Sequence, residues 1–288
     1  AGLTTGAGRG EGVGGAALGA LRQTDALVHV IRAFANAEVP HPDERVDPLA
    51  DAEAVDLELI TADAAQIERR LERVVKTARS GDPEAKAELA ELETLRAQLD
   101  GGRPARGSDD ADARRRGDEM GLLTSKPVLY VVNTDEPGPP PQEILDHAAA
   151  QGAQAMALPV GVELELAEMA PEDAAELAAE LELGDERGGP AVVEAAYRLL
   201  DLVTFFTGSG PPEARAWPIP RGTTADRAAG KIHSDLERGF IRAEVVAWED
   251  LVEAGSFAKA RESAKLQMEG KDYVVREGDV LQIRFNVS

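Results

Sequence analysis

The amino-acid sequence predicts an α/β fold that contains an inserted helical hairpin and ends in a smaller α+β unit. Short apolar runs rich in β-branched residues alternate with helix-like segments, which is typical of a parallel sheet covered by helices. A heptad pattern interrupts that alternation from Leu57 onward. The stretch from Gly208 to Pro212 is rich in glycine and proline, so it predicts a linker before the C-terminal unit.

Composition narrows the possible functions. The chain has 288 residues, enough for two domains, and no cysteine, which excludes disulfides and thiolate metal sites. No apolar run is long enough to span a membrane, so a cytoplasmic protein without a membrane partner is expected. The formal net charge of −22 argues against indiscriminate nucleic-acid binding. From Ala214 onward, however, 12 basic residues balance 12 acidic ones, which makes this part the better candidate for contacting RNA or a ribosome.

The first fifteen residues are too rich in glycine for the interior of a helix or strand. Gly10, Gly12 and Gly15 fit the G-x-G-x-x-G pattern of a dinucleotide-binding loop, but no strand precedes them, so a mobile loop is the favoured interpretation. Because the chain starts inside such a loop without an initiator methionine, we expect its beginning to be missing. Residues 16–24 are then predicted to form a helix, and residues 26–31 a buried strand.

A polar loop is predicted between residues 32 and 48, and it contains His41 between Pro40 and Pro42. The two prolines favour a stiff, extended backbone at this histidine. A lone loop histidine is usually a solvated surface residue, but it can also hold a water molecule or a phosphate group. The four histidines of the chain show no metal-ligand spacing, so no metal site is predicted within it.

A helical hairpin is predicted between residues 57 and 117. Apolar residues recur at alternating steps of three and four, as in a coiled-coil seam, and residues 80–83 break the pattern before a second helix begins. Residues 100–117 are expected to be a loop in which Arg114, Arg115 and Arg116 form a solvated basic run or, less favoured, an RNA contact. The predicted seam of the first helix is Leu57, Ile60, Ala64, Ile67, Leu71, Val74 and Ala78.

The segment KPVLYVVNTDE, residues 126–136, is the centre of the predicted sheet. Its apolar run from Pro127 to Val132 indicates a buried parallel strand, and ligands of such sheets bind just beyond the carboxyl ends of the strands. Asn133 and Glu136 follow this strand, so an amide and a carboxylate are available there to bind a heterocyclic base. The alternative interpretation is simply a strand that ends in a polar turn.

Four further elements are predicted before the linker. Residues 142–151 are expected to be a helix, residues 153–159 a strand, and residues 171–183 and 191–206 two more helices. Together with the earlier elements they continue the α/β alternation.

The C-terminal unit is predicted to contain a small sheet crossed by a helix. Strands are expected at residues 214–219 and 240–248, with a helix at residues 228–237 between them and a second helix at 248–254. Residues 272–275 and 280–286 are predicted to form a hairpin around Gly278. This arrangement is typical of a β-grasp fold, which does not by itself indicate a function.

Two stretches of the C-terminal unit carry a specific resemblance. RAWPIPRGTTADRAAGKIHSDLERGFIRAEV begins at Arg215, and EGKDYVVREGDVLQIRFNV ends at Val287; together they resemble a TGS domain. The rest of the chain resembles the YchF or Obg-like ATPases, a branch of the translation-factor-class P-loop NTPases. AGLTTGAGRGEGVGG, TDALVHVIRAF, VDPLADAEAVDLELITAD and NTDE each look like a segment of that family, so the resemblance covers nearly the whole chain.

The resemblance implies a fold and a set of domains. Residues 1–56 and 118–203 would form part of a G domain of the P-loop NTPase type, with a parallel sheet. Residues 57–117 would be its inserted coiled-coil hairpin, and residues 204–288 a C-terminal β-grasp domain of the TGS type. The phosphate-binding motif G-x-x-x-x-G-K-[ST] does not occur among the 288 residues, so it and the Mg²⁺ ligands are expected upstream of Ala1.

The resemblance also implies roles in nucleotide binding. Asn133 and Glu136 look like the base-binding N-x-x-E motif, whose glutamate replaces the guanine-binding aspartate of GTPases and is associated with acceptance of ATP. Gly2 looks like the glycine whose backbone amide faces the γ-phosphate. Pro159 and Val160 stand where the family's fifth base-contact segment commonly has a small Ser-Ala type pair.

The same resemblance implies a role in hydrolysis for one histidine. Leu3 occupies the place of the glutamine that orients water in Ras-like GTPases, and a leucine side chain cannot do so by hydrogen bonding. His41 looks like the loop histidine that the family is thought to use instead.

Two functions therefore compete. The first is an ATPase that accepts ATP with Mg²⁺, or GTP as an alternative nucleotide. It would associate with the 50S or 70S ribosome or with RNA through the TGS domain and the coiled coil. In that case the chain in hand is expected to be inactive, because the phosphate-binding motif is not among its residues. The second is a non-catalytic module that binds ribosome or RNA through the same two parts. Nucleotide binding separates the two.

Overall fold

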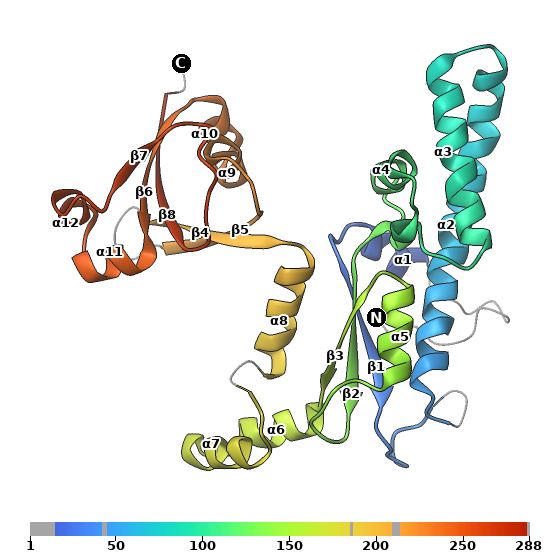
Figure 1. Cartoon of the computed structure of the whole chain (residues 1–288), viewed down its shortest axis with the longest axis horizontal. Helices are drawn as coiled ribbons and strands as arrows, with labels where there is room; N and C mark the ends of the chain where they lie inside the picture. The colour runs from blue at the N-terminus through green and yellow to red at the C-terminus, as the bar shows by residue number, and fades with distance from the viewer. Residues whose placement is uncertain (1–14, 42–44, 185–186, 209–213, 287–288) are drawn as a thin grey trace. The chain divides into compact units, whose positions relative to one another are not determined.

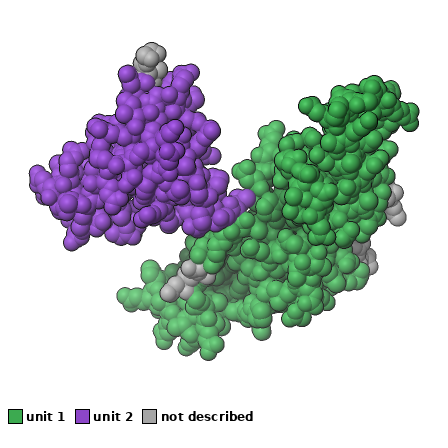
Figure 2. Space-filling view, turned by 45° about the horizontal axis from the view of Figure 1, so that its top comes forward, with its two compact units in different colours: residues 1–199 green, residues 200–288 purple. Residues whose placement is uncertain are grey.

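The computed structural model describes residues 15–41, 45–184, 187–208 and 214–286, which form two compact units. The first unit contains residues 1–199 and the second residues 200–288 (Figures 1 and 2). The glycine-rich segment with Gly2, Gly10 and Gly12 lies outside the described residues. None of the helices within the described ranges is both long and apolar enough to cross a membrane.

The sheet of the first unit has three parallel strands in the order β1-β2-β3, which confirms the predicted parallel sheet. The strands are β1 (Leu27–Ala33), β2 (Val128–Thr134) and β3 (Gln154–Leu158). Residues 128–132 of β2 are buried without a break, because this central strand is covered on both faces. The main apolar core lies between the sheet and the helices α1 (Gly15–Arg22), α2 (Pro48–Arg79) and α5 (Gln142–Ala150).

Two antiparallel helices, α2 and α3 (Pro83–Asp100), form the predicted hairpin (Figure 1). Each begins with an aspartate that caps the helix and a proline in the first turn: the Asp47 carboxylate accepts from the Ala50 backbone N–H at 3.0 Å, and Asp82 caps α3 in the same way. The helix α2 has 32 residues and is therefore about 48 Å long. It begins at residue 48, so its first turns pack on the sheet before it leaves as the hairpin.

The seam of the hairpin agrees with the heptad prediction, except at its first position. Ile60, Ile67 and Val74 of α2 pack against Leu92 and other apolar residues of α3 in one buried cluster. Leu57 was predicted to belong to this seam, but its side chain is 61% exposed. The prediction was wrong there because α2 at residue 57 still lies beside the sheet and has not yet met α3.

The stretch after α3 contains a helix that the sequence did not predict. Residues 100–117 were expected to be a loop, yet α4 (Ala111–Glu119) forms there, capped by the Asp110 carboxylate. Ala113 and Gly117 are fully covered, and Arg116 pairs with Glu91 of α3 at 2.7 Å. Charge clusters and glycine suggested a loop, but the small residues of α4 allow it to pack closely on the hairpin. Two short 3₁₀ turns, η2 (Ala105–Gly107) and η3 (Leu123–Ser125), flank this helix.

Three helices follow β3, and the last is shorter than predicted. They are α6 (Val160–Glu168), α7 (Pro171–Glu180) and α8 (Gly188–Leu199). A helix was predicted to run from residue 191 to residue 206, but residues 202–208 form the strand β4 (Leu202–Gly208). The sequence LVTFFTG is apolar enough for either element, and pairing with the neighbouring strand β5 (Ala214–Pro220) decides for a strand.

The second unit is a five-stranded sheet in the order β5-β4-β8-β6-β7. The first strand, β4, lies parallel to the last, β8 (Asp279–Phe285), and the other pairs are antiparallel. Along the chain, helices α9 (Ala225–Ile232) and α10 (Ser234–Arg238) follow β5 and precede β6 (Phe240–Ala247). They cross the sheet, as expected for a β-grasp fold. The remaining elements are α11 (Trp248–Ala254), α12 (Phe257–Glu262) and β7 (Gln267–Glu269).

Two predictions about this second unit were wrong. The stretch from residue 208 to 212 is not a linker between units, because it joins β4 to β5, which pair with each other; the units divide between Leu199 and Leu200. Residues 272–275 do not form a hairpin with β8. Only an isolated bridge joins Val274 to Thr224, and β6 pairs with β7 and β8 instead.

Candidate functional site

The candidate site lies at the carboxyl edge of the three-stranded sheet. The register aligns Arg32 of β1 with Asn133 of β2, and Asn133 with Leu158 of β3, so the three strands end side by side. The Asn133 side-chain oxygen accepts a hydrogen bond from the Val160 backbone N–H at 3.2 Å. This bond joins two segments that are 27 residues apart and brings together two of the predicted nucleotide-binding residues.

The residues around the predicted glutamate form a polar turn after β2. The Thr134 hydroxyl donates to the Glu136 backbone oxygen at 2.8 Å, which fixes the turn, and the Glu136 side chain is exposed at the edge. The Asp135 carboxylate accepts from the Ala35 backbone N–H at 3.1 Å. Asp135 thereby ties the turn to the segment after β1. Sequence reasoning assigned no role to Asp135, although its place inside the motif was a signal for one.

Pro159 and Val160 form the start of helix α6, directly after β3. Pro159 is buried and occupies the cap position of the helix, while Val160 is 41% exposed. The backbone N–H of Val160 donates to the Asn133 side-chain oxygen, so this hydrogen bond joins the start of α6 to the end of β2. What this segment offers to a ligand is an apolar side chain at the N-terminal end of a helix.

His41 is held by the first turn of α2. Its Nε2 atom lies 3.0 Å from a carboxylate oxygen of Asp51, and both side chains are largely covered. The loop before it is fixed by Arg32, whose guanidinium donates to the backbone oxygens of Phe34, Asn36 and Val39. Since this loop leaves the sheet at the end of β1, it starts from the edge at which Asn133 lies.

No group of three or more histidine, aspartate or glutamate side chains within the described ranges is arranged to hold a metal ion. Gly2, predicted to face the γ-phosphate, lies outside those ranges. The polar groups that lie at this edge are the Asn133 amide and the Glu136 carboxylate.

A buried polar cluster lies behind the site, between α2, β2 and α5. The Asp56 carboxylate accepts from the Tyr130 hydroxyl at 2.6 Å and lies 2.8 Å from Nε2 of His147. Burial, together with the Asp56 charge, raises the pKa of Tyr130 well above its ordinary value. Burial also lowers the pKa of His29, whose ring lies 5.5 Å from that of Tyr130. The cluster couples the hairpin helix to the strand that carries Asn133.

A second buried carboxylate, Asp63, ties α2 to the segment before β2. Its side chain is fully buried and accepts from the backbone N–H groups of Leu123 at 3.0 Å and Thr124 at 2.7 Å. Arg22 of α1 donates to the same carboxylate at 3.2 Å. Sequence reasoning missed both Asp56 and Asp63, because neither departs from the polar pattern expected on a hairpin helix.

Comparison with known proteins gives matches over the whole chain. The ribosome-binding ATPase YchF of Bacillus subtilis is 41% identical over 295 residues, and the match covers 100% of this chain and 80% of that protein. The protein of the same name from Escherichia coli O157:H7 is also 41% identical with the same coverage. Obg-like ATPase 1 of rice, Oryza sativa subsp. japonica, is 38% identical, covering 100% of this chain and 75% of its own length.

Family and structural comparisons point the same way. The family YchF-GTPase_C, described as "Protein of unknown function (DUF933)", matches residues 202–286, which are most of the second unit. The structure of the YchF GTPase of Schizosaccharomyces pombe aligns with a TM-score of 0.76 at 30% identity, covering 96% of this chain and 76% of that one. A GTP-binding protein of Pyrococcus horikoshii, at 18% identity and a TM-score of 0.57, shares the fold.

The identity, the coverage and the three-part architecture agree with the resemblance seen in the sequence. The chain belongs to the YchF/Obg-like ATPase family.

Proposed function

We propose that this chain belongs to a cytoplasmic ribosome-binding ATPase. The observation that carries the proposal is the hydrogen bond between Asn133 and Val160, which assembles the base-binding edge from two separate segments. Relatives named ribosome-binding ATPase YchF support the activity and the partner. In the proposed organisation, residues 1–56 and 118–199 act as the nucleotide-binding domain, residues 57–117 as the hairpin and residues 200–288 as the TGS domain.

The nucleotide base is proposed to bind at the carboxyl edge of the sheet. The Asn133 side-chain oxygen already accepts from Val160, which leaves its amide nitrogen to donate to a ring nitrogen of the base. Glu136 is exposed beside it and is an acceptor for an exocyclic amine, which adenine presents. Pro159 and Val160 provide an apolar contact for the ring. Gly2 is proposed to place its backbone amide near the γ-phosphate.

Hydrolysis is proposed to depend on His41. Its contact with Asp51 holds the imidazole at 3.0 Å from a carboxylate, a pairing that fixes the ring orientation. Mg²⁺ would accompany the nucleotide and neutralise phosphate charge.

Titration of ATP and GTP into the full-length protein tests the base assignment. We expect ATP to bind at least as tightly as GTP, because Glu136 replaces the aspartate that binds guanine. The Asn133→Ala variant should weaken both nucleotides, since it also frees the start of α6. Exclusive binding of GTP would contradict the assignment. The 288-residue chain alone should bind weakly, because the phosphate-binding motif is not among its residues.

A second candidate function is a module that binds RNA or ribosome through the hairpin and the TGS domain without catalysis. The two candidates share the partner and differ in nucleotide binding. If the full-length protein binds neither ATP nor GTP but sediments with ribosomes, the non-catalytic module is the better description.

The ribosome is proposed to contact the TGS domain and the hairpin. The second unit is electrically balanced from Ala214 onward, so phosphate is not repelled there. Arg238 and Arg242 flank the partly exposed Phe240 at the start of β6, a cationic and aromatic surface that suits RNA. Deleting residues 200–288 or residues 57–117 should each weaken co-sedimentation with 50S and 70S particles. If neither deletion has an effect, the assigned surfaces are wrong.

A further inference from the structure

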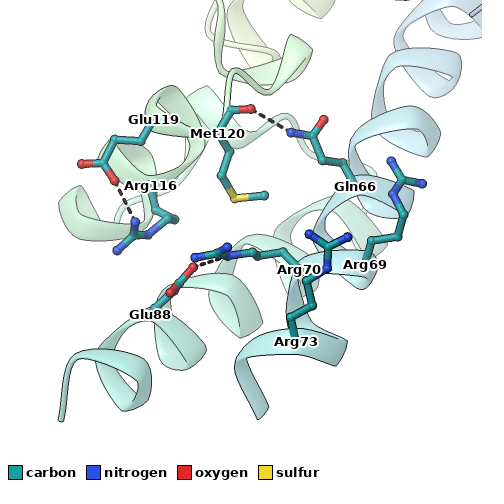
Figure 3. Close-up of a pocket in the computed structure, with 8 residues that line it drawn as sticks. All are labelled: Gln66, Arg69, Arg70, Arg73, Glu88, Arg116, Glu119 and Met120. Carbon is teal, nitrogen blue, oxygen red and sulfur yellow. Dashed lines mark hydrogen bonds and ion pairs between the residues drawn. The ribbon is translucent and has the colours of Figure 1, made fainter. Parts of the chain in front are cut away.

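A pocket of about 390 Å³ opens on the hairpin, between α2, α3 and α4 (Figure 3). Three arginines of α2 line it, Arg69, Arg70 and Arg73, and α4 adds Arg116. The glutamates at its wall are Glu88 of α3 and Glu119 of α4. A cluster of four arginines is unexpected in a chain with a net charge of −22.

Only half of this positive charge is compensated by carboxylates. Arg70 pairs with Glu88 at 2.5 Å, and Arg116 pairs with Glu119 at 2.8 Å and with Glu91 at 2.7 Å. Arg69 and Arg73 are exposed, and no ion pair or side-chain hydrogen bond to either is found within the described part of the chain. Two guanidinium groups, four residues apart on one helix face, are therefore available to an external anion.

The pocket is held in shape by the packing of the hairpin. Gln66 of α2 donates to the backbone oxygen of Met120 at 2.7 Å and closes one end (Figure 3). Beneath it, the buried cluster of the hairpin includes Ile67, Leu92 and Ala113, one from each of the three helices. The ion pairs of Arg70 and Arg116 fix these two side chains across the opening. Two of the four arginines, Arg70 and Arg116, are thus held in place, and α2, which carries Arg69 and Arg73, is itself held by the packing of the hairpin.

We infer that this pocket binds the phosphate backbone of RNA through Arg69 and Arg73, as the hairpin's contact with the ribosome; the inference rests on the proposed ribosome binding. Guanidinium groups bind phosphate oxygens in a bidentate manner. Two successive phosphates of one RNA strand can each bind one of the two arginines. A single carboxylate side chain of an acidic protein can bind only one of them. The hairpin is also suited to RNA by its overall charge, because residues 57–117 contain 12 basic and 13 acidic residues in an otherwise strongly acidic unit.

The test compares two variants that each remove two positive charges from the hairpin of the full-length protein. Arg69→Gln/Arg73→Gln removes the two unpaired pocket arginines, and Lys86→Gln/Arg103→Gln removes two exposed basic residues outside the pocket. Binding to a short RNA duplex is measured over a range of salt concentrations, and co-sedimentation with ribosomes is measured alongside. Circular dichroism checks that both variants are folded.

The expected result is a change confined to the pocket variant. Loss of two phosphate contacts should lower the slope of log affinity against log salt by about 2 and weaken RNA binding at 0.1 M salt by more than roughly tenfold. The Lys86→Gln/Arg103→Gln control should keep the wild-type slope. A third variant, Arg69→Lys/Arg73→Lys, should recover part of the affinity, because lysine keeps the charge without the bidentate geometry.

Failure of this inference differs from failure of the proposed function. If wild-type protein sediments with ribosomes and the pocket variant behaves like its control, the pocket is not the RNA contact. If wild-type protein does not sediment with ribosomes, the proposed function is wrong, while the duplex titration still decides whether the pocket binds RNA. Equal loss in both double variants would also overturn the pocket assignment, because it would show a general charge effect.

Discussion

Replacing Asp63 with alanine tests whether the hairpin helix is anchored to the nucleotide-binding sheet by this carboxylate. The substitution removes the acceptor of two buried backbone N–H groups, those of Leu123 and Thr124, at a side chain with no exposed surface. Each unpaired N–H costs about 1–3 kcal/mol. Arg22 loses its carboxylate as well but keeps the Gly121 backbone oxygen at 2.9 Å. We therefore expect a loss of about 3–5 kcal/mol in the free energy of unfolding of the first unit.

The two units can be followed separately in one urea titration. Both tryptophans, Trp217 and Trp248, belong to the second unit, so fluorescence reports its unfolding alone. The far-ultraviolet circular dichroism is dominated by the helices, of which α2 and α3 are the longest, so it reports chiefly on the first unit. Asp63→Ala should move the circular dichroism transition to lower urea and leave the fluorescence transition unchanged.

A matched control separates the anchor from any effect of charge. Asp100 pairs with Arg96 at 2.9 Å on the exposed surface of the hairpin, with 57% of the Asp100 side chain exposed. Asp100→Ala should therefore cost less than about 1 kcal/mol. If Asp63→Ala costs no more than Asp100→Ala, or if both signals shift together, the anchoring role deduced for Asp63 is wrong.

Three further predictions concern the site and the core behind it. Glu136→Asp should shift the full-length protein from ATP toward GTP in parallel nucleotide titrations, because the shorter carboxylate restores the guanine-binding motif; an unchanged ratio would contradict the role of Glu136. His41→Ala should lower kcat without raising KM in steady-state hydrolysis assays, as for a group that acts only in the transition state, whereas weaker binding at unchanged kcat would indicate a structural role. Burial lowers the pKa of His29 in the folded state, so the unfolded chain binds its proton first as pH falls. The free energy of unfolding should therefore decrease as the pH drops below the ordinary value of 6.5, and His29→Leu should flatten that decrease in urea titrations followed by circular dichroism. A decrease of the same size in His29→Leu would mean that another group causes it.

The sequence by itself determined the elements whose signals are local. Asp47-Pro48 and Asp82-Pro83 carry local start signals for the two hairpin helices, because an aspartate can cap the first turn and a proline needs no hydrogen-bond partner there. The hairpin was nevertheless predicted to begin only at residue 57, nine residues after the start of α2. The heptad spacing determined the seam from Ile60 onward. The uninterrupted apolar run before Asn133 determined a buried central strand. The roles expected of Asn133, Glu136 and His41 came from family resemblance, since their spacing alone also fits a polar turn and a surface loop.

Tertiary structure decided every feature that depends on residues far apart in the chain. LVTFFTG became a strand because β5 and β8 offer it partners on both sides, which no local pattern shows. The charged stretch before Gly117 became a helix because α3 supplies Glu91 for its arginines.

The site and its support were decided in the same way. Val160 meets Asn133 only because β2 and β3 end side by side. Asp56 and Asp63 follow the polar pattern of a hairpin helix, and only the fold buries them among the donors of other segments. Capping and periodicity act over a few residues and can be read from the chain, whereas burial and pairing are properties of surfaces that exist only after the chain has folded.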